Sequence, residues 1–248
     1  MREVVIVDGM RTAFGRMGGA LRPFTPVQLA GMTIKGLCEK TDILNKGKVD
    51  AVFAGSASGD VNTHNFARYA SLIAGLPYET SATFIEMQCG SSIACINNAA
   101  LQIQAGIIDV AICGGAEAHS QDYYKFPASV EPYKDHPPTA APRRLAPTDE
   151  DNMSMIEISD GMAVKWGITR EQLDEFSVIS QNRAEAAIKA GKFKDEIVPV
   201  EVKKKKETIV FDTDEGPRHG STIEGLAKLR AINPGGFVTA GNASGIND

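Results

Sequence analysis

The amino-acid sequence predicts an α/β protein in which helices cover both faces of a mainly parallel sheet. Short apolar runs alternate with helical patterns from the N-terminus to about residue 118, as expected for strands joined by crossover helices. These runs lack polar alternation, which is typical of strands buried on both faces. A small-residue helical pattern also begins directly after Cys89, at the end of one such run. Because chemistry in these folds lies at the carboxyl ends of strands, Cys89 is a candidate functional residue.

The composition is that of a globular protein with no bias toward nucleic acid or membrane. The chain has 248 residues, of which 43% are hydrophobic and 23% charged, so it can bury one large core or two modest ones. A net charge of -5 gives no general attraction to nucleic acid or anionic lipid, so neither is expected as a partner. No apolar run has transmembrane length and no signal peptide precedes the first apolar run, which predicts a cytoplasmic protein.

The cysteines and histidines predict free thiols and no metal site. The sequence contains no Cys-x-x-Cys pair, which favours a reducing compartment. The histidines are scattered, without the spacing of metal ligands. The residues concerned are Cys38, Cys89, Cys95, Cys113, His64, His119, His136 and His219.

The first elements follow from apolar runs and helix-start signals. Val4–Val7 is predicted to be a buried strand. Thr25-Pro26 supplies an N-cap and a first-turn proline for a helix that extends to about Glu39. Its inner stripe is predicted to contain Leu29, Met32, Thr33 and Leu37.

The next elements lead to the candidate nucleophile. Val49–Ala54, Thr83–Met87 and Val110–Cys113 are predicted strands, and Asn65 is expected to cap a helix over Phe66–Ala74 that Gly75 ends. The helix after Cys89 is apolar around most of its circumference, which predicts that it is enclosed by protein.

Cys89 has two possible roles. Its thiol would lie beside the first free N–H groups of the helix, where the helix dipole favours a thiolate. The alternative is a small buried thiol of the kind found in many cores. Cys95 and Cys113 lie within a helix and a strand and are predicted to be core residues, as Cys38 is on its amphipathic helix.

The alternation of apolar runs and helical patterns stops after Ser120. Prolines without periodicity over Asp122–Pro147 predict an irregular excursion. Helices are predicted at Ser154–Trp166, at Arg170–Ala190 behind a Thr169–Gln172 capping box, and at Glu224–Leu229.

A hairpin is predicted between the last two of these helices. Ile197–Val202 and Thr208–Phe211 would be its strands, with Lys203–Lys206 between them. These lysines are explained either as a solvated turn or as a phosphate site.

Several motifs together resemble those of the thiolases, acetyl-CoA acetyltransferases in particular. The resemblance covers the chain from end to end. It rests on Val4-Val5-Ile6-Val7 with Arg11-Thr12-Ala13-Phe14-Gly15, Asn65-Phe66-Ala67-Arg68, Cys89-Gly90-Ser91-Ser92, Cys113-Gly114-Gly115-Ala116-Glu117 and Gly241-Asn242-Ala243-Ser244-Gly245-Ile246-Asn247-Asp248.

The resemblance implies a thiolase-like fold with a buried central helix and an inserted α+β loop domain. It places an N-terminal α/β domain carrying the nucleophile at 1–118, a coenzyme A-binding loop domain at 119–243, and the start of a second α/β domain at 244–248. The C-terminal half of that fold is expected to be absent, as in a truncated or split gene product.

The resemblance also implies a reaction and its residues. Cys89 would take an acyl group from acyl-CoA, and the enolate of a second acetyl-CoA would attack it to give a 3-ketoacyl-CoA. Arg218 matches an arginine beside the nucleotide, although an exposed turn arginine is the alternative. Ser244 and Ala240 match the wall along the pantetheine, and Met155 the boundary of the acyl pocket.

Departures from the family pattern leave substrate preference open. The differing positions are Ser92, Ser154 and Gly225. The family's Gly-His-Pro histidine, its water-positioning asparagine and its second, Cys-x-Gly-Gly-Gly cysteine have no match in this sequence, so the isolated chain is expected to be inactive.

Other functions stay open at this stage. They are a related condensing enzyme such as a 3-ketoacyl synthase, a non-catalytic CoA-binding chain of a heteromeric assembly, and a cysteine hydrolase using one of the present histidines. The resemblance further implies a homo-oligomer, dimer or tetramer, with coenzyme A as part of the substrate and no tightly bound cofactor.

Overall fold

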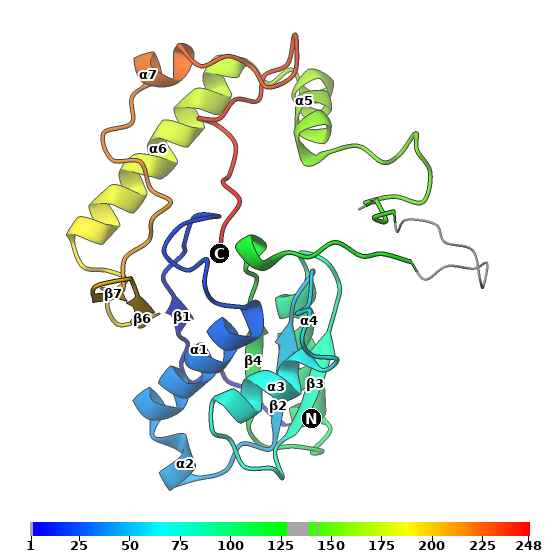
Figure 1. The fold of residues 1–248 in the computed structure, drawn as a ribbon, viewed down its shortest axis with the longest axis vertical. Coiled ribbons are helices and arrows are strands. Elements are labelled where there is room, and N and C mark those ends of the chain that lie inside the picture. Colours follow the sequence, from blue (N-terminus) through cyan, green and yellow to red (C-terminus); the bar gives the residue numbers. More distant parts are fainter. Residues whose placement is uncertain (1, 128–138, 143) are drawn as a thin grey trace. The chain divides into compact units, whose positions relative to one another are not determined.

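The computed structural model describes residues 2–127, 139–142 and 144–248 (Figure 1). The chain divides into two compact units. The first contains Met1–Asp122, Gly191–Gly216 and Ile246–Asp248, and the second contains Tyr123–Ala190 and Pro217–Gly245. The 191–216 hairpin region therefore packs with the first unit, whereas the sequence places it inside a 119–243 domain. That functional division stays a prediction.

The centre of the first unit is a parallel sheet with the strand order β3-β2-β4. The strands are β2 (Ala51–Gly55), β3 (Ser81–Ile85) and β4 (Ala111–Gly115), each within two residues of its predicted start. Every residue of β2 is buried. The apolar runs thus correctly predict a parallel sheet whose central strand is covered on both faces.

Side chains of β2 alternate between two hydrophobic clusters, because successive residues of a strand point to opposite faces. Val52 and Ala54 pack with residues of α1 (Pro26–Thr41) and α3 (Phe66–Ile73). Ala51 and Phe53 pack with Cys95 and Ala99 of α4 (Ser91–Gln104) on the other face. The first unit thus has helices on both faces of its sheet (Figure 1).

The predicted helix starts are confirmed by their capping bonds. Thr25 and Gln28 form a reciprocal capping box at the start of α1, and the Asn65 side chain accepts a hydrogen bond from Arg68 N at the start of α3. The short helix α2 (Ile43–Lys46) follows α1 after Asp42, a left-handed residue with φ 57°.

The predicted inner stripe of α1 is only partly correct. Leu29 is buried, but Met32, Thr33 and Leu37 are half-buried. The helix contacts two hydrophobic clusters instead of one, so a second buried face is formed by Val27, Ala30, Ile34 and Cys38. A single stripe cannot describe a helix that packs on two sides.

The predicted strand at Val4–Val7 is wrong. The structure assigns no strand to these residues, and the exposed fractions of Ile6 and Val7 are both 85%. An apolar run becomes a strand only where another strand offers hydrogen bonds, and these residues have none in the described chain. The first strand is β1 (Arg11–Thr12), which pairs in parallel with β5 (Ile197–Val198).

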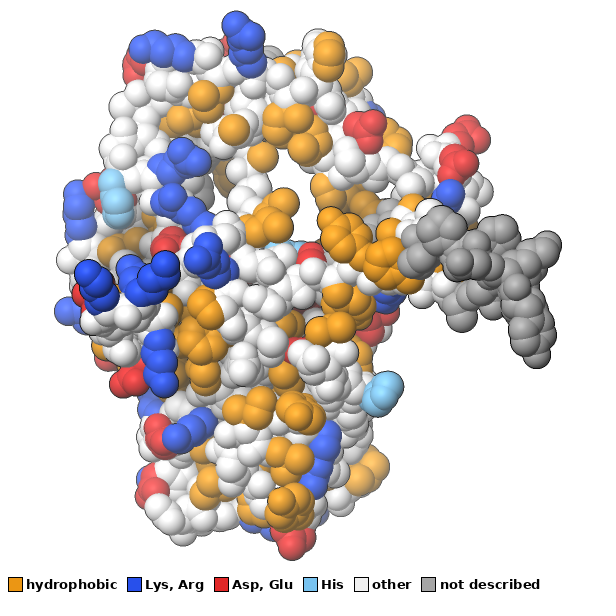
Figure 2. Space-filling view, viewed as in Figure 1, with side chains coloured by type: hydrophobic (Ala, Val, Ile, Leu, Met, Phe, Trp, Pro, Cys, Tyr) orange, Lys and Arg blue, Asp and Glu red, His pale blue; other side chains and the backbone are white. Residues whose placement is uncertain are grey.

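The predicted hairpin is confirmed. It consists of β6 (Val200–Lys203) and β7 (Thr208–Phe211), paired antiparallel. Val200, Val202 and Phe211 are buried in a third cluster, whereas Lys203 at the end of β6 and the lysines of the following turn, 204–206, are exposed. Lysine and arginine side chains gather over this hairpin in Figure 2.

The helix after Cys89, α4, is predicted to be enclosed by protein, but in the described residues it is buried on only one side. Only Ser91, Ala94, Cys95 and Ala99 of α4 are buried. Ile93, Ile96 and Leu101 on other faces of α4 are 38–64% exposed, because within the described residues only the sheet packs against it.

In the described residues of the second unit there are three helices. They are α5 (Met155–Trp166), α6 (Arg170–Lys189) and α7 (Ile223–Ala227), and the first two begin with capping boxes at Ser154 and Thr169. Between the 3-10 turn His119–Gln121 and α5, the described residues form no helix or strand, as predicted for the excursion. Pro132, Pro137 and Pro138 of that excursion lie outside the described residues.

Candidate active site

Cys89 lies at the point where β3 passes into α4. Its thiol is free and exposed. Gln88, the residue before it, has a left-handed conformation with φ 49°, which few non-glycine residues adopt. Such backbone strain persists only where the surroundings enforce it and is common at functional sites. The turn therefore presents the sulfur of Cys89 at the carboxyl edge of the sheet.

The Ser91 hydroxyl closes this turn. Its Oγ accepts a hydrogen bond from Met87 N at 2.9 Å and donates one to the Gln88 carbonyl at 2.6 Å. Backbone bonds add to it, since Gly90 N donates to Met87 O and Ser91 N to Gln88 O. Ser91 is only 4% exposed, so these bonds are shielded from water. The serine fixes the backbone on both sides of Cys89.

Two strand-end glycines form the base on which α4 begins. A Cβ at Gly55 would lie 2.7 Å from Ser91 Cβ, and a Cβ at Gly115 would lie 2.4 Å from Ser92 Oγ. Real Cβ atoms do not come this close to other atoms, so both positions need glycine. The close contacts at the ends of β2 and β4 thereby fix how near the first turn of α4, and with it Cys89, lies to the sheet. Sequence analysis missed these roles, although glycine at the end of a buried strand was a usable signal.

Glu117 ties together the segments that follow β2 and β4. Its Oε1 accepts hydrogen bonds from Ser56 Oγ at 2.8 Å and from Ala57 N. Its Oε2 is buried and has no hydrogen-bond partner in the described chain. The carboxylate thus orders the loop after β2, at the same sheet edge as Cys89.

The other three cysteines are poorly suited to act as nucleophiles. Cys38 and Cys95 are buried. Burial raises the pKa of Cys38, and it raises the pKa of Cys95 to about 11. Burial, followed by the neighbouring Cys95, also raises the pKa of Cys113 to about 11. Their assignment as core residues is supported, because a neutral thiol is a weak nucleophile.

A histidine partner for Cys89 is not found in the described part of the chain. His119 is 2.9 Å from Asp122, and His219 is 3.7 Å from Glu185. No hydrogen bond joins the Cys89 sulfur to a described histidine, and His136 lies outside the described residues. The cysteine-hydrolase hypothesis gains no support.

The remaining predicted site residues belong to the second unit, where each is exposed. Arg218 lies on a loop held to α6, because its backbone N–H donates to Gln181 Oε1 at 2.8 Å and Gly220 N donates to Glu185 Oε2 at 2.9 Å. No hydrogen bond or ion pair of the Arg218 guanidinium is found in the described residues.

Met155 is the first residue of α5 and is 60% exposed. Ser154 before it accepts a hydrogen bond from Glu157 N at 3.2 Å, so this serine caps the helix. Gly225, another departure from the family pattern, donates from its N–H to Thr222 Oγ1 at the start of α7. Ala240 and Ser244 lie on the exposed segment that follows the short bridge at Ala231 and Thr239.

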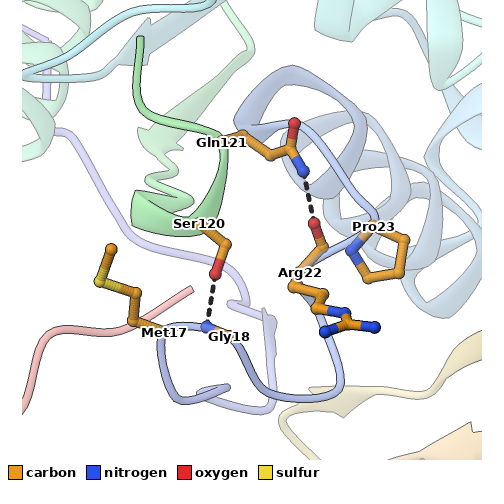
Figure 3. Close-up of a pocket in the computed structure, with 6 residues that line it drawn as sticks. All are labelled: Met17, Gly18, Arg22, Pro23, Ser120 and Gln121. Atoms are coloured by element: carbon orange, nitrogen blue, oxygen red, sulfur yellow. Dashed lines mark hydrogen bonds between the residues drawn. The ribbon is translucent and has the colours of Figure 1, made fainter.

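A hollow of about 800 Å³ in the first unit lies elsewhere (Figure 3). It is lined by Met17, Gly18, Arg22, Pro23, Ser120 and Gln121. Ser120 Oγ accepts a hydrogen bond from Gly18 N at 2.6 Å and donates one to Asp248. None of the predicted site residues lines this hollow.

The described residues contain no group of three or more His, Cys, Asp or Glu side chains placed to hold a metal ion. In the same residues, no helix combines the length and apolarity needed to cross a membrane.

Comparisons with a family model and with curated proteins point to the same family. Residues 4–248 match the family model described as thiolase, N-terminal domain. An acetyl-CoA acetyltransferase from Chromobacterium violaceum is 41% identical over 251 residues, and a beta-ketoadipyl-CoA thiolase from Acinetobacter baylyi is 40% identical over 259 residues. These alignments cover 99% and 100% of this chain, respectively, and 64% of each relative.

A solved structure shows the same fold. The crystal structure of the Bacillus anthracis acetyl-CoA acetyltransferase matches with a TM-score of 0.84 and 34% sequence identity, over 96% of this chain and 61% of that one. The chain thus spans a little under two thirds of the length of these relatives. Together, the family match, the sequence identities and the shared fold show that this chain belongs to the thiolase family, whose N-terminal domain it contains.

Proposed function

We propose that this chain serves acyl transfer between acyl-CoA thioesters through an acyl-enzyme on Cys89, giving or cleaving a 3-ketoacyl-CoA such as acetoacetyl-CoA. The observation that carries the proposal is the exposed Cys89 thiol at the strand end, held by Ser91, in a chain of the thiolase family. Relatives named acetyl-CoA acetyltransferase and beta-ketoadipyl-CoA thiolase support the same chemistry.

In the first step, the Cys89 thiolate attacks the thioester carbonyl of an acyl-CoA. A new bond forms between Cys89 sulfur and the acyl carbon, the bond between that carbon and the CoA sulfur breaks, and CoA leaves as a thiol after taking up a proton. A thiolate suits this exchange because it is both a good nucleophile and a good leaving group. The backbone N–H of Cys89 is the proposed donor to the developing oxyanion.

In the second step, a base removes a proton from the methyl group of acetyl-CoA. The resulting enolate carbon attacks the acyl carbon on Cys89, the carbon–sulfur bond to Cys89 breaks, and a 3-ketoacyl-CoA is released. The reverse sequence is thiolytic cleavage. The base is not assigned to a residue of this chain.

Four residues of the second unit are proposed to hold coenzyme A. The free guanidinium of Arg218 suits a phosphate or the face of the adenine. Ala240 and Ser244 would line the pantetheine chain, and Met155 would bound the acyl group. Coenzyme A enters as part of the substrate, without a tightly bound cofactor. We also propose a cytoplasmic homo-oligomer, a dimer or a tetramer.

The test is acylation by radiolabelled acetyl-CoA, followed by mass spectrometry of the peptide that contains Cys89. We expect one acetyl group on Cys89, with one equivalent of CoA thiol released. The Cys89→Ser variant should abolish labelling, and Cys113→Ser, its matched control, should retain it.

Other outcomes would each overturn the proposal in a different way. Binding of CoA without acylation would indicate the non-catalytic assembly chain. Continuous hydrolysis of acetyl-CoA by this chain alone would indicate a cysteine hydrolase.

A further inference from the structure

The segment from Ile232 to Asn242 is held by hydrogen bonds within the loop itself and by carboxylates of two neighbouring helices. A single bridge between Ala231 and Thr239 closes its base, and it forms no helix or strand of its own. Such a loop would ordinarily have few constraints on its shape. It carries Ala240 and leads to Ser244, two of the residues proposed to line the pantetheine.

Asp160 of α5 holds one side of this loop. Its Oδ1 accepts hydrogen bonds from Phe237 N at 2.7 Å and Val238 N at 2.9 Å, while its Oδ2 accepts one from Asn233 Nδ2 at 2.9 Å. Burial raises the pKa of Asp160, but these bonds outweigh burial and lower the pKa below its ordinary value. Asp160 is therefore ionised at neutral pH and accepts three bonds at once.

Asp174 of α6 holds the other side. It is 2% exposed, and its Oδ1 accepts a hydrogen bond from Asn242 Nδ2 at 2.9 Å. Its Oδ2 accepts one from Arg170 Nε at 2.8 Å, which neutralises the buried charge. Asn242 in turn accepts from Thr239 N at 2.7 Å and donates to Phe237 O at 3.1 Å. The asparagine of the Asn-Ala-Ser-Gly motif is thus fully engaged within the protein.

Two glycines allow the loop to approach these helices. A Cβ at Gly236 would lie 2.5 Å from Asp160 Oδ2, and a Cβ at Gly241 would lie 2.6 Å from Leu229 Cδ1. The loop therefore fits against the carboxylate of Asp160 and the leucine of the α7 region only without side chains at these positions.

We propose that Asp160 and Asp174 are positioning residues that hold the loop bearing Ala240, and through it the segment to Ser244, in the shape that accepts the pantetheine chain of coenzyme A. This rests on the proposed function. The residues act through the backbone of the loop and do not contact the substrate. Loss of either carboxylate lowers the fraction of molecules whose loop can bind CoA. The apparent Kd for CoA rises in inverse proportion to that fraction.

The experiment compares Asp160→Asn, Asp174→Asn and a control, Glu175→Gln, which changes an exposed carboxylate on the same helix as Asp174. Calorimetry measures CoA binding, and single-turnover acetylation of Cys89 gives the maximal rate and the half-saturating acetyl-CoA concentration. We expect both Asp variants to bind CoA about tenfold more weakly, as for a loop that is competent about one tenth of the time. The maximal acetylation rate and the iodoacetamide alkylation of Cys89 should not change.

A reciprocal exchange separates positioning from simple destabilisation. In Asp160→Asn/Asn233→Asp, the new amide at 160 keeps an oxygen for Phe237 N and Val238 N, while its nitrogen faces a carboxylate at 233. This double variant should recover CoA binding to within about threefold of the parent protein. If it binds as weakly as Asp160→Asn, or if both single variants bind like the parent, the positioning role is overturned.

Failure of the proposed function would give a different result. In that case the parent protein itself would either not bind CoA or bind it without acetylation of Cys89, whereas failure of the positioning role leaves both CoA binding and acetylation of the parent intact. If a single variant fails to fold by circular dichroism, the double exchange still decides the outcome.

Discussion

Ser91 lies directly against Gly55, so that a Cβ added to the glycine would be 2.7 Å from the Cβ of the serine. The backbone at the end of the central strand β2 thus packs against a side chain in the first turn of α4. Because Ser91 also bonds to Met87 and Gln88, this contact fixes the position of Cys89 relative to the sheet. The first predictions follow from it.

A methyl group at Gly55 should displace the start of α4. We expect Gly55→Ala to lower the free energy of unfolding by about 1–3 kcal/mol, the cost typical of overpacking, and to slow alkylation of Cys89. Gly114→Ala is the matched control, since a Cβ there meets nothing within 4 Å. Chemical denaturation and timed iodoacetamide labelling measure the two effects. Equal stability and equal labelling of the two variants would contradict the packing argument.

Removal of the Ser91 hydroxyl should loosen the Cys89 turn. In Ser91→Ala, the Met87 N–H loses its acceptor and the Gln88 carbonyl loses a donor, which should cost about 1–3 kcal/mol. The rate of acetylation at Cys89 should fall more than stability alone explains. Ser92→Ala, at the exposed next position, is the control. The prediction fails if acetylation by the two variants is indistinguishable.

Alkylation at pH 8 should distinguish the four thiols. Cys89 is exposed, whereas Cys38 is 5% and Cys95 0% exposed. With a pKa of about 11, Cys113 is ionised in about one molecule per thousand at this pH. Iodoacetamide and mass spectrometry should therefore find label on Cys89 alone in the folded protein and on all four cysteines in denaturant. Label on Cys95 before Cys89 would show that the helix is oriented differently.

Acid should remove the contribution of Asp50 to stability. The N–H of Asp109, the side chain of Lys48 and the N–H of Val110 lower the pKa of Asp50 to about 2. A folded pKa below the unfolded value of about 3.9 means that the stabilisation is full above pH 4 and is lost as the pH falls toward 2. We expect Asp50→Ala to be about 1–3 kcal/mol less stable than the parent at pH 7, with the difference shrinking steadily below pH 4.

Urea unfolding at a series of pH values measures this difference. Glu79→Gln, which changes an exposed carboxyl group, provides the baseline. A difference between Asp50→Ala and the parent that is independent of pH would show that the Asp50 charge has no role.

Much of the local structure could be predicted from the sequence. The Thr25, Asn65 and Thr169 caps are confirmed, because capping depends on hydrogen bonds within a few residues of the helix start. The three strands of the parallel sheet and the place of Cys89 at a strand end follow from short-range patterns as well, although only β2 is buried throughout. The match of the motifs to the thiolase family was also evident in the sequence and is confirmed.

Errors arose where a residue's environment depends on distant parts of the chain. The apolar run Val4–Val7 forms no strand and is exposed from Val5 to Val7, since a strand needs a partner that the run itself cannot supply. The buried face of α1 that contains Val27, Ala30, Ile34 and Cys38 was missed because two clusters, built from segments far apart in the sequence, pack against one helix.

The sequence by itself determined the helix starts, the three strands of the parallel sheet, the place of Cys89 at a strand end and the family, since each depends on residues close together or on motifs. Only the tertiary structure decided which surfaces are buried and which side chains fix the loops. The contacts of Gly55 with Ser91 and of Gly115 with Ser92, and the hydrogen bonds from the Ala240 loop to Asp160 and Asp174, join residues tens of positions apart. No periodicity or spacing encodes such contacts, because they form only when separate elements pack together.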